Sequence, residues 1–140
     1  MKATEINNTH IKTLDHIPPE VIELYVGRNR IRDISGIKNY EFIECLDLSN
    51  NLVDNIEVLP TLPSLEIVDL RGNPLELIYQ YKPLKGMVNL RCLMVDSKYI
   101  DLDTLRDFLN IGGLYVCDPK ITVKEFVETM QEEISRIKSN

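Results

Sequence analysis

The stretch IECLDLSNNLV, residues 43–53, decides how this chain folds. Apolar residues occupy its first, fourth, sixth and eleventh places, and Asn51 occupies the ninth. The alternation of Leu46 and Leu48 with polar residues predicts a half-buried strand. Because Asn is depleted in strands, the adjacent Asn50 and Asn51 indicate that the strand ends there. At least one of them is expected to have a structural task.

The same pattern recurs along the chain. It also begins at residues 21 and 65, so the three matches share a constant spacing of 22 residues. A fixed period of this length predicts a solenoid, in which each unit packs only against its neighbours. Looser copies contribute Ile6 and Ile11 to a first unit, Leu90, Leu93, Val95 and Ile100 to a fifth, and Ile111, Leu114, Val116 and Ile121 to a sixth.

The second half of each unit follows another rule. In the second unit Ile34, Ile37 and Tyr40 are spaced three residues apart, which is the period of a 3-10 helix. We therefore expect each unit to contain a strand, a turn and a short 3-10 return. The fourth unit is 25 residues long, and its additional residues predict an added turn near YQYKP, residues 79–83.

These motifs resemble the leucine-rich-repeat proteins of the 22-residue class, which is named after a protein-phosphatase regulatory subunit. The resemblance covers residues 1–121 and implies an α/β solenoid of about six repeats. It implies a parallel sheet on the concave face, short 3-10 turns on the convex face, and non-catalytic binding of another protein through the concave face. Acidic nuclear phosphoproteins and a spliceosomal snRNP protein carry similar repeats. A ribonucleoprotein-assembly component and a phosphatase-regulatory subunit are therefore the alternatives.

Residues 122–140 are expected to form a capping helix of the same domain. Thr122 and Glu125 match a capping box at its start. We expect the apolar face of this helix to cover the last repeat, because a solenoid must shield its open end. The alternative is a partner-binding or membrane helix, and its acidic polar face argues against a membrane. The apolar face contains Val123, Phe126, Val127, Met130, Ile134 and Ile137.

The ninth place of the repeat is expected to stabilise the fold. Asn29, Asn51 and Asn73 occupy it in the second, third and fourth units. Their amides should turn inward and bind the backbone of neighbouring turns, forming a structural ladder. Arg28 and Asn50 stand one place earlier, on the rim, where we expect contact with a partner or with water.

The odd places of the strand predict the binding surface. Alternate side chains face opposite sides of a sheet, so the third, fifth and seventh places lie on the concave face. Asp47 and Asp69 would then be neighbours. Like charges on adjacent strands are unfavourable, so we predict a site for a basic segment of another protein. A solvated face neutralised by Arg71 is the simpler alternative. The predicted partner-binding residues are Glu23, Tyr25, Asp47, Ser49, Ile67, Asp69, Arg71, Met94, Asp96 and Tyr115.

The three cysteines are also assigned to concave places. The repeat register separates the Cα atoms of Cys45 and Cys92 by about 9.6 Å, and those of Cys92 and Cys117 by about 13 Å. Both distances exceed the limit of about 7 Å for a disulfide. We expect free thiols, typical of a reducing compartment, and no metal site.

Composition narrows the functional classes. The net charge is −6, from 16 basic and 22 acidic residues, which argues against direct nucleic-acid binding. No apolar run approaches the ~20 residues of a membrane span, and no signal peptide is evident. We therefore expect an intracellular protein, cytoplasmic or nuclear, that does not bind membranes.

Catalysis is not expected. His10 and His16 both fall in the first unit, without a neighbouring nucleophile. There is no glycine-rich phosphate loop, and an open solenoid face would give Asp47 and Asp69 no enclosing cleft. We predict neither an enzyme nor a cofactor. We expect a monomer, with self-association through the exposed edge of the first strand as the alternative.

Overall fold

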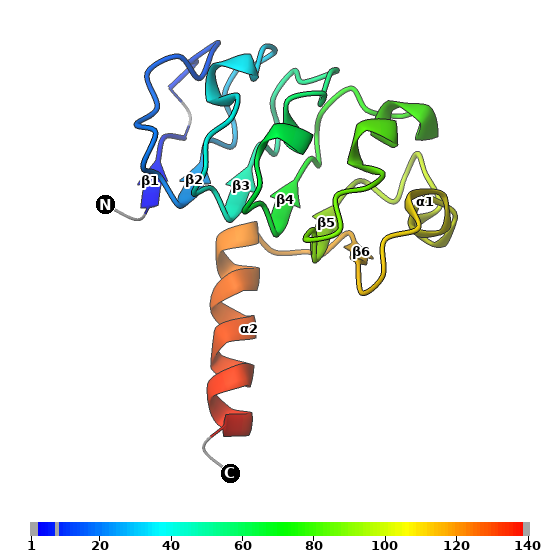
Figure 1. The fold of residues 1–140 in the computed structure, drawn as a ribbon. Coiled ribbons are helices and arrows are strands. Elements are labelled where there is room, and N and C mark those ends of the chain that lie inside the picture. Colours follow the sequence, from blue (N-terminus) through cyan, green and yellow to red (C-terminus); the bar gives the residue numbers. More distant parts are fainter. Residues whose placement is uncertain (1–2, 8, 139–140) are drawn as a thin grey trace.

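The centre of the molecule is a six-stranded parallel sheet whose strand order follows the chain (Figure 1). The computed structural model describes residues 3–7 and 9–138, and for residues 132–138 it describes the backbone alone. The strands are β1 (Ala3–Glu5), β2 (Glu23–Tyr25), β3 (Cys45–Asp47), β4 (Ile67–Asp69), β5 (Cys92–Met94) and β6 (Tyr115–Cys117).

The first five strands keep the register that the repeat predicts. Residues from the fifth place of each unit form one row across the sheet: Glu5, Tyr25, Asp47, Asp69 and Met94. The fourth and sixth places point to the other side and form the core, where Leu24, Leu46 and Leu48 are completely buried. Burying each such side chain contributes about 1.5–3 kcal/mol, so every unit depends on its neighbours.

The convex side of the second to fourth units consists of 3-10 helices, as predicted. They are η1 (Ser35–Ile37), η2 (Leu59–Thr61) and η3 (Ile78–Leu84). The longer η3 contains residues 79–83, which confirms the added turn.

The fifth unit contradicts the expected 3-10 return. Its convex element is an α-helix, α1 (Leu102–Leu109). The Asp101 carboxylate accepts a hydrogen bond from the Thr104 amide at 2.9 Å, which caps the start of the helix. Leu102, Leu105 and Leu109 have helical spacing, and the latter two are buried. A cap followed by this spacing favours an α-helix over the period of three.

The register of the last strand also differs from the prediction. Cys92 lies opposite Tyr115, and Met94 lies opposite Cys117. The repeat alignment placed Tyr115 opposite Met94, so β6 is shifted by two residues. Gly112 and Gly113 form the turn before β6, and Gly113 has a φ of 78°. The α-helix and this glycine turn replace the 3-10 return of the earlier units. The repeat spacing therefore does not predict the register of β6.

The ninth-place asparagines form a ladder of hydrogen bonds inside the turns. The side-chain oxygen of Asn51 accepts a hydrogen bond from the backbone amide of Ile31 at 3.0 Å. Its side-chain NH₂ donates to the backbone carbonyls of Val26 and Leu48, each at 3.0 Å. Asn73 repeats this arrangement one unit later, accepting from the Val53 amide at 2.9 Å. Each amide therefore links two units and satisfies backbone groups that the turn leaves unpaired.

The C-terminal helix α2 (Val123–Lys138) lies on the concave side of the sheet. Figure 1 shows it beginning beneath β3 and β4 and pointing away from the sheet. Its apolar side chains pack on the inner face of the sheet, in one cluster with residues of β2 to β6. Phe126 stacks on Tyr115 of the last repeat, so the helix reaches that repeat from the concave face. Of its predicted apolar face, Ile134 and Ile137 are outside the side chains described, and residues 139–140 are outside the described chain. In the described part, no helix is long and apolar enough to cross a membrane.

Candidate binding face

The first two turns of α2 pack into the concave face. Thr122 caps the helix through the Glu125 amide at 3.1 Å, as the capping box predicted. Val123 is completely buried, while Phe126 and Val127 are partly buried, whereas Met130 is 47% exposed. The first three side chains contact a second apolar cluster made of Tyr25, Cys45, Ile67, Cys92, Met94 and Cys117. Among the α2 residues whose side chains are described, those docked against the sheet lie in the first two turns, and Met130 is exposed.

Arg71 binds the segment that leads into α2. Its guanidinium forms an ion pair with the Asp69 carboxylate at 2.8 Å. The same guanidinium donates hydrogen bonds to the carbonyls of Pro119 and Ile121, the latter at 2.9 Å. Asp69 is completely buried. Arg71 therefore connects the acidic centre of the sheet to the C-terminal segment. Removing Arg71 would leave the Asp69 charge buried and unpaired, which is strongly destabilising.

Asp47 has a different set of partners. Its carboxylate accepts hydrogen bonds from the amide and the hydroxyl of Ser49, at 2.9 and 2.6 Å. Burial raises the pKa of Asp47, the Ser49 hydrogen bonds oppose this shift, and the negative charge of Asp69 adds to it. Asp47 is therefore a buried acid with its own donors.

The predicted partner-binding residues all lie on the concave face or its rim, but the structure divides them by exposure. Tyr25, Asp47, Asp69 and Met94 are buried, so the central acidic and apolar patch is covered rather than open. Tyr115 is 57% exposed. The half-buried residues are Glu23, Ser49, Ile67, Arg71 and Asp96.

The rim position has a structural role that the sequence analysis missed. Arg28 and Asn50, both exposed, have φ values of 57° and 56°, and Gly72 at the same place has 73°. The eighth place thus requires a left-handed backbone, which Asn and Gly adopt most easily. An ideal Cβ on Gly72 would lie 2.3 Å from the side-chain Oδ1 of Asn50. The recurring Asn and Gly at this place were the available signal.

An acidic hollow of about 370 Å³ lies between α2 and the strands β1 and β2. Lys124 forms an ion pair with Glu5 at 3.0 Å, and Glu23 accepts a hydrogen bond from the Tyr25 hydroxyl at 2.7 Å. Burial raises the pKa of Tyr25, so its phenol remains a donor. With Glu128 on the helix side, the described residues that line the hollow include three carboxylates and one cation.

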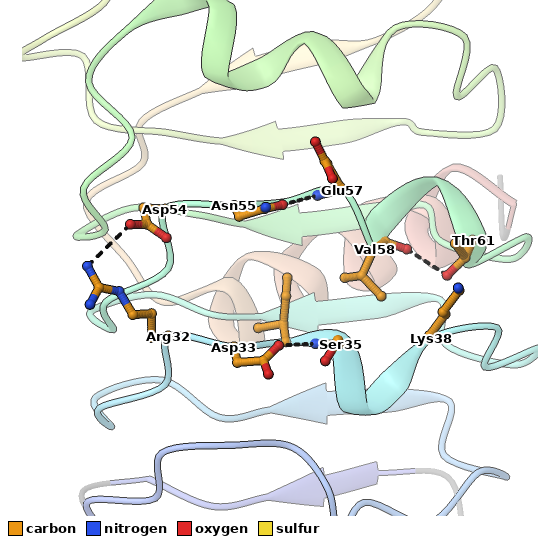
Figure 2. Close-up of a pocket in the computed structure, with 10 residues that line it drawn as sticks. Arg32, Asp33, Ser35, Lys38, Asp54, Asn55, Glu57, Val58 and Thr61 are labelled. Carbon is orange, nitrogen blue, oxygen red and sulfur yellow. Dashed lines mark hydrogen bonds and ion pairs between the residues drawn. The ribbon is translucent and has the colours of Figure 1, made fainter.

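A second hollow lies on the convex side between η1 and η2 (Figure 2). Asp33 accepts a hydrogen bond from the Ser35 amide at 2.9 Å, and Asn55 accepts from the Glu57 amide at 2.9 Å, so both side chains stabilise local turns. Arg32 forms an exposed ion pair with Asp54 one unit away, at 3.4 Å. These polar groups already bind one another or the backbone, and the hollow has mixed charge.

Among residues 3–7 and 9–131, whose side chains are described, no three His, Cys, Asp or Glu side chains gather as metal ligands would. His10 adopts a left-handed backbone conformation (φ 59°) in the first unit and is not among the residues that line the two hollows.

Comparisons with known proteins agree with this geometry. A solved structure of internalin C2 from Listeria monocytogenes is similar, with a TM-score of 0.66 and 26% sequence identity. The match covers 82% of this chain and 50% of that chain, so this chain spans about half the length of its structural neighbour. No protein-family model and no curated protein matches.

Internalin C2 is a leucine-rich-repeat protein, and the present chain has the same parallel sheet built from consecutive repeats. The chain has the leucine-rich-repeat fold. Leucine-rich-repeat folds are generally non-enzymatic scaffolds that bind other proteins. The resemblance deduced from the repeat spacing is thus confirmed at the level of the fold.

Proposed function

We propose that this leucine-rich-repeat protein is a non-catalytic module that binds another protein on its concave side. We propose further that the partner places a basic segment in the acidic hollow between α2 and the strands β1 and β2. The observation that carries this proposal is the charge of that hollow: Glu5, Glu23 and Glu128 line it, and Lys124 is the one cation among the described residues that line it.

The hollow has the groups that a lysine or arginine side chain requires. Lys124 already pairs with Glu5, which leaves Glu23 and Glu128 without a cationic partner among the ion pairs of the described residues. Tyr25 adds an aromatic ring, and the Lys124 ammonium lies 5.9 Å from its centroid. Charge complementarity of this kind favours association and its specificity.

Two of the residues predicted from the sequence as the centre of the site have another role in this proposal. Asp69 is occupied by Arg71, which binds the carbonyls of Pro119 and Ile121. Asp47 is occupied by Ser49. We therefore assign Asp69 to holding the C-terminal segment through Arg71, and Asp47 to the turn at Ser49. Glu23, Glu128 and the exposed Tyr115 are assigned to contact with the partner.

Matched charge reversals test this function. Tagged full-length chain carrying Glu23→Lys, which alters the concave hollow, is compared with Glu57→Lys, the same charge change on the exposed convex side. Proteins are captured from native extract, quantified by mass spectrometry and confirmed by direct binding with the purified partner. We expect a partner bound by the wild type and by Glu57→Lys but lost with Glu23→Lys. We also expect binding to weaken as salt rises.

The opposite patterns contradict the proposal. A partner that binds Glu23→Lys as well as the wild type excludes the acidic hollow, and one lost only with Glu57→Lys indicates the convex side. Salt-sensitive recovery of RNA would favour the ribonucleoprotein alternative, and recovery of a phosphatase would favour the regulatory-subunit alternative. Recovery of the chain itself would favour self-association, for which β1 is the edge strand.

A further inference from the structure

The register shift of β6 brings two cysteines together. Cys117 lies opposite Met94, two residues beyond the partner of Cys92, and both side chains are on the concave face. Their sulfur atoms are 4.0 Å apart. The separation of about 13 Å expected from repeat counting is therefore wrong, because that counting placed β6 two residues out of register.

The third cysteine is separated from this pair. Cys45 lies on β3 in the same row as Cys92 on β5, with Ile67 of β4 between them. A separation of two strands, about 9.6 Å, is too long for a disulfide. All three are free thiols and all three are buried. The chain therefore contains one adjacent pair and one isolated thiol in a similar environment.

We propose that Cys92 and Cys117 form a disulfide when the protein is exposed to a peroxide, and that Cys45 does not take part. This modification site is independent of the partner-binding function proposed above. It rests on the distance between the two sulfur atoms and on the position of β6 at the end of the sheet.

The two thiols have unequal chemistry. The Cys92 thiol hydrogen-bonds to Cys117 and lowers its pKa, and the positive charge of Arg71 acts in the same direction. Burial opposes this shift. The same hydrogen bond and burial raise the pKa of Cys92. Cys117 is therefore the thiol that ionises first, and the thiolate is the form that reacts.

The reaction balances with hydrogen peroxide as the oxidant. The Cys117 thiolate attacks one peroxide oxygen, the O–O bond breaks, and hydroxide leaves, giving a sulfenic acid on Cys117. The hydroxide takes the thiol proton of Cys92 and becomes water. The Cys92 sulfur then attacks the sulfenic sulfur, and the second hydroxide leaves and takes up the proton that Cys117 had released. Two thiols lose two hydrogens, and one peroxide becomes two waters.

Bond formation requires a movement of β6 relative to β5. Cys92 and Cys117 are two places out of register on neighbouring strands, where Cα atoms lie about 7–8 Å apart, at or beyond the limit of about 7 Å for a disulfide. The sulfur atoms must approach from 4.0 Å to about 2.05 Å. Since β6 pairs only with β5, it can shift without breaking a second ladder. The bond would tie β6 to β5 immediately before the segment that Arg71 holds.

Mass spectrometry of the full chain tests the inference. Reduced wild-type protein is treated with equimolar hydrogen peroxide, denatured and alkylated. We expect the loss of two hydrogen masses, alkylation of Cys45 alone, and a cross-linked peptide pair containing Cys92 and Cys117. Cys45→Ser should behave in the same way. Cys92→Ser should instead trap a dimedone adduct on Cys117, whereas Cys117→Ser should leave Cys92 unlabelled.

Several results would overturn the inference. Three alkylated cysteines after treatment exclude the disulfide, and a cross-link that includes Cys45 or a second chain excludes this pairing. Accumulation of sulfinic acid on Cys117 without a cross-link shows that Cys92 cannot reach it. The decisive measurement uses the wild type, so its outcome does not depend on whether any of the variants folds.

Discussion

The second to fourth units and the sixth unit contribute strands to the same sheet, but different contacts hold their turns and their strand register. In the middle units a buried asparagine joins each turn to its neighbour, and the register follows the repeat. In the sixth unit the observed register places Ile121 at the position of the ladder asparagine. This unit also has a glycine turn before its strand and a register shifted by two residues from the repeat count.

The contrast between these units shows what fixes register in this solenoid. A ladder asparagine satisfies backbone groups of two units only at one alignment, so a slip would leave them buried and unpaired. In the sixth unit no such amide constrains the strand. There the C-terminal segment stabilises the end of the sheet instead, through Arg71 and Val123. Four substitutions test this difference between the middle units and the sixth unit, and they are given in order of decreasing expected effect.

Asn51→Leu removes the centre of the ladder. It leaves the Ile31 amide and the carbonyls of Val26 and Leu48 without their side-chain partner. We expect a loss of about 3 kcal/mol in the free energy of unfolding, measured by urea denaturation. Asn89→Leu is the control, because Asn89 is exposed and its amide is 3.5 Å from its acceptor. Equal effects of the two substitutions would mean that the ladder does not stabilise the middle units.

Val123→Ser tests the docking of α2. Val123 is completely buried against the sheet, and replacing it with a hydroxyl should cost about 2 kcal/mol of docking free energy. Hydrogen exchange should accelerate at the amides of residues 123–127 and at β6, but not at β2 and β3. Met130→Ser should change nothing, because Met130 is 47% exposed on the same helix. Acceleration throughout the middle units would show that the two regions are not separate.

Gly113→Ala tests the turn before β6. Gly113 has a φ of 78°, and an added Cβ would meet no atom within 4 Å, so the cost is confined to the left-handed backbone. We expect a loss of about 1 kcal/mol, measured as thermal stability. Gly112→Ala should be neutral or slightly stabilising, because Gly112 is outside the left-handed region. A Cβ added to Gly112 would also meet no atom within 4 Å. A reversed order would contradict the assigned turn.

The sequence was sufficient for the middle units because each observation had a single structural solution. Ninth-place asparagines, apolar places and the period of three all agree there, and they predict the sheet, the core and the 3-10 returns. The α-helix of the fifth unit was also readable, since Asp101 is a capping residue followed by Leu102, Leu105 and Leu109. The expectation of a 3-10 return in every unit is wrong for these residues, because the cap and the helical spacing favour an α-helix.

Two features could not be deduced from the pattern. The glycines at 112 and 113 permit several turn geometries, so they do not determine the register of β6. The apolar stripe of α2 predicts that one face is buried, but a stripe does not identify the surface that covers it. Because α2 packs on the concave face, the exposure of the candidate site on that face depends on where α2 docks. The strand register correctly placed Asp47 and Asp69 side by side on the concave face. It could not indicate that both are buried, or that Arg71 links Asp69 to the C-terminal segment.

Asp47→Asn gives the smallest effect and tests the acidic row of the middle units through pH. Burial raises the pKa of Asp47 above its unfolded value, and the charge of Asp69 adds to this. The favourable contribution of the protonated group is therefore complete below the unfolded pKa of about 3.9. It is lost as pH rises through the folded pKa. An asparagine oxygen can still accept from Ser49 without carrying charge, so the variant should lose this decline in stability.

Thermal melts of wild type and Asp47→Asn across that pH range make the comparison. Asp33→Asn is the control, at an exposed turn where the Ser35 amide lowers the pKa of the aspartate. It should change the slope in the opposite sense, because the stabilisation from Asp33 is present above the unfolded pKa and lost as pH falls. Parallel curves for wild type and Asp47→Asn would show that the buried aspartate carries no electrostatic cost.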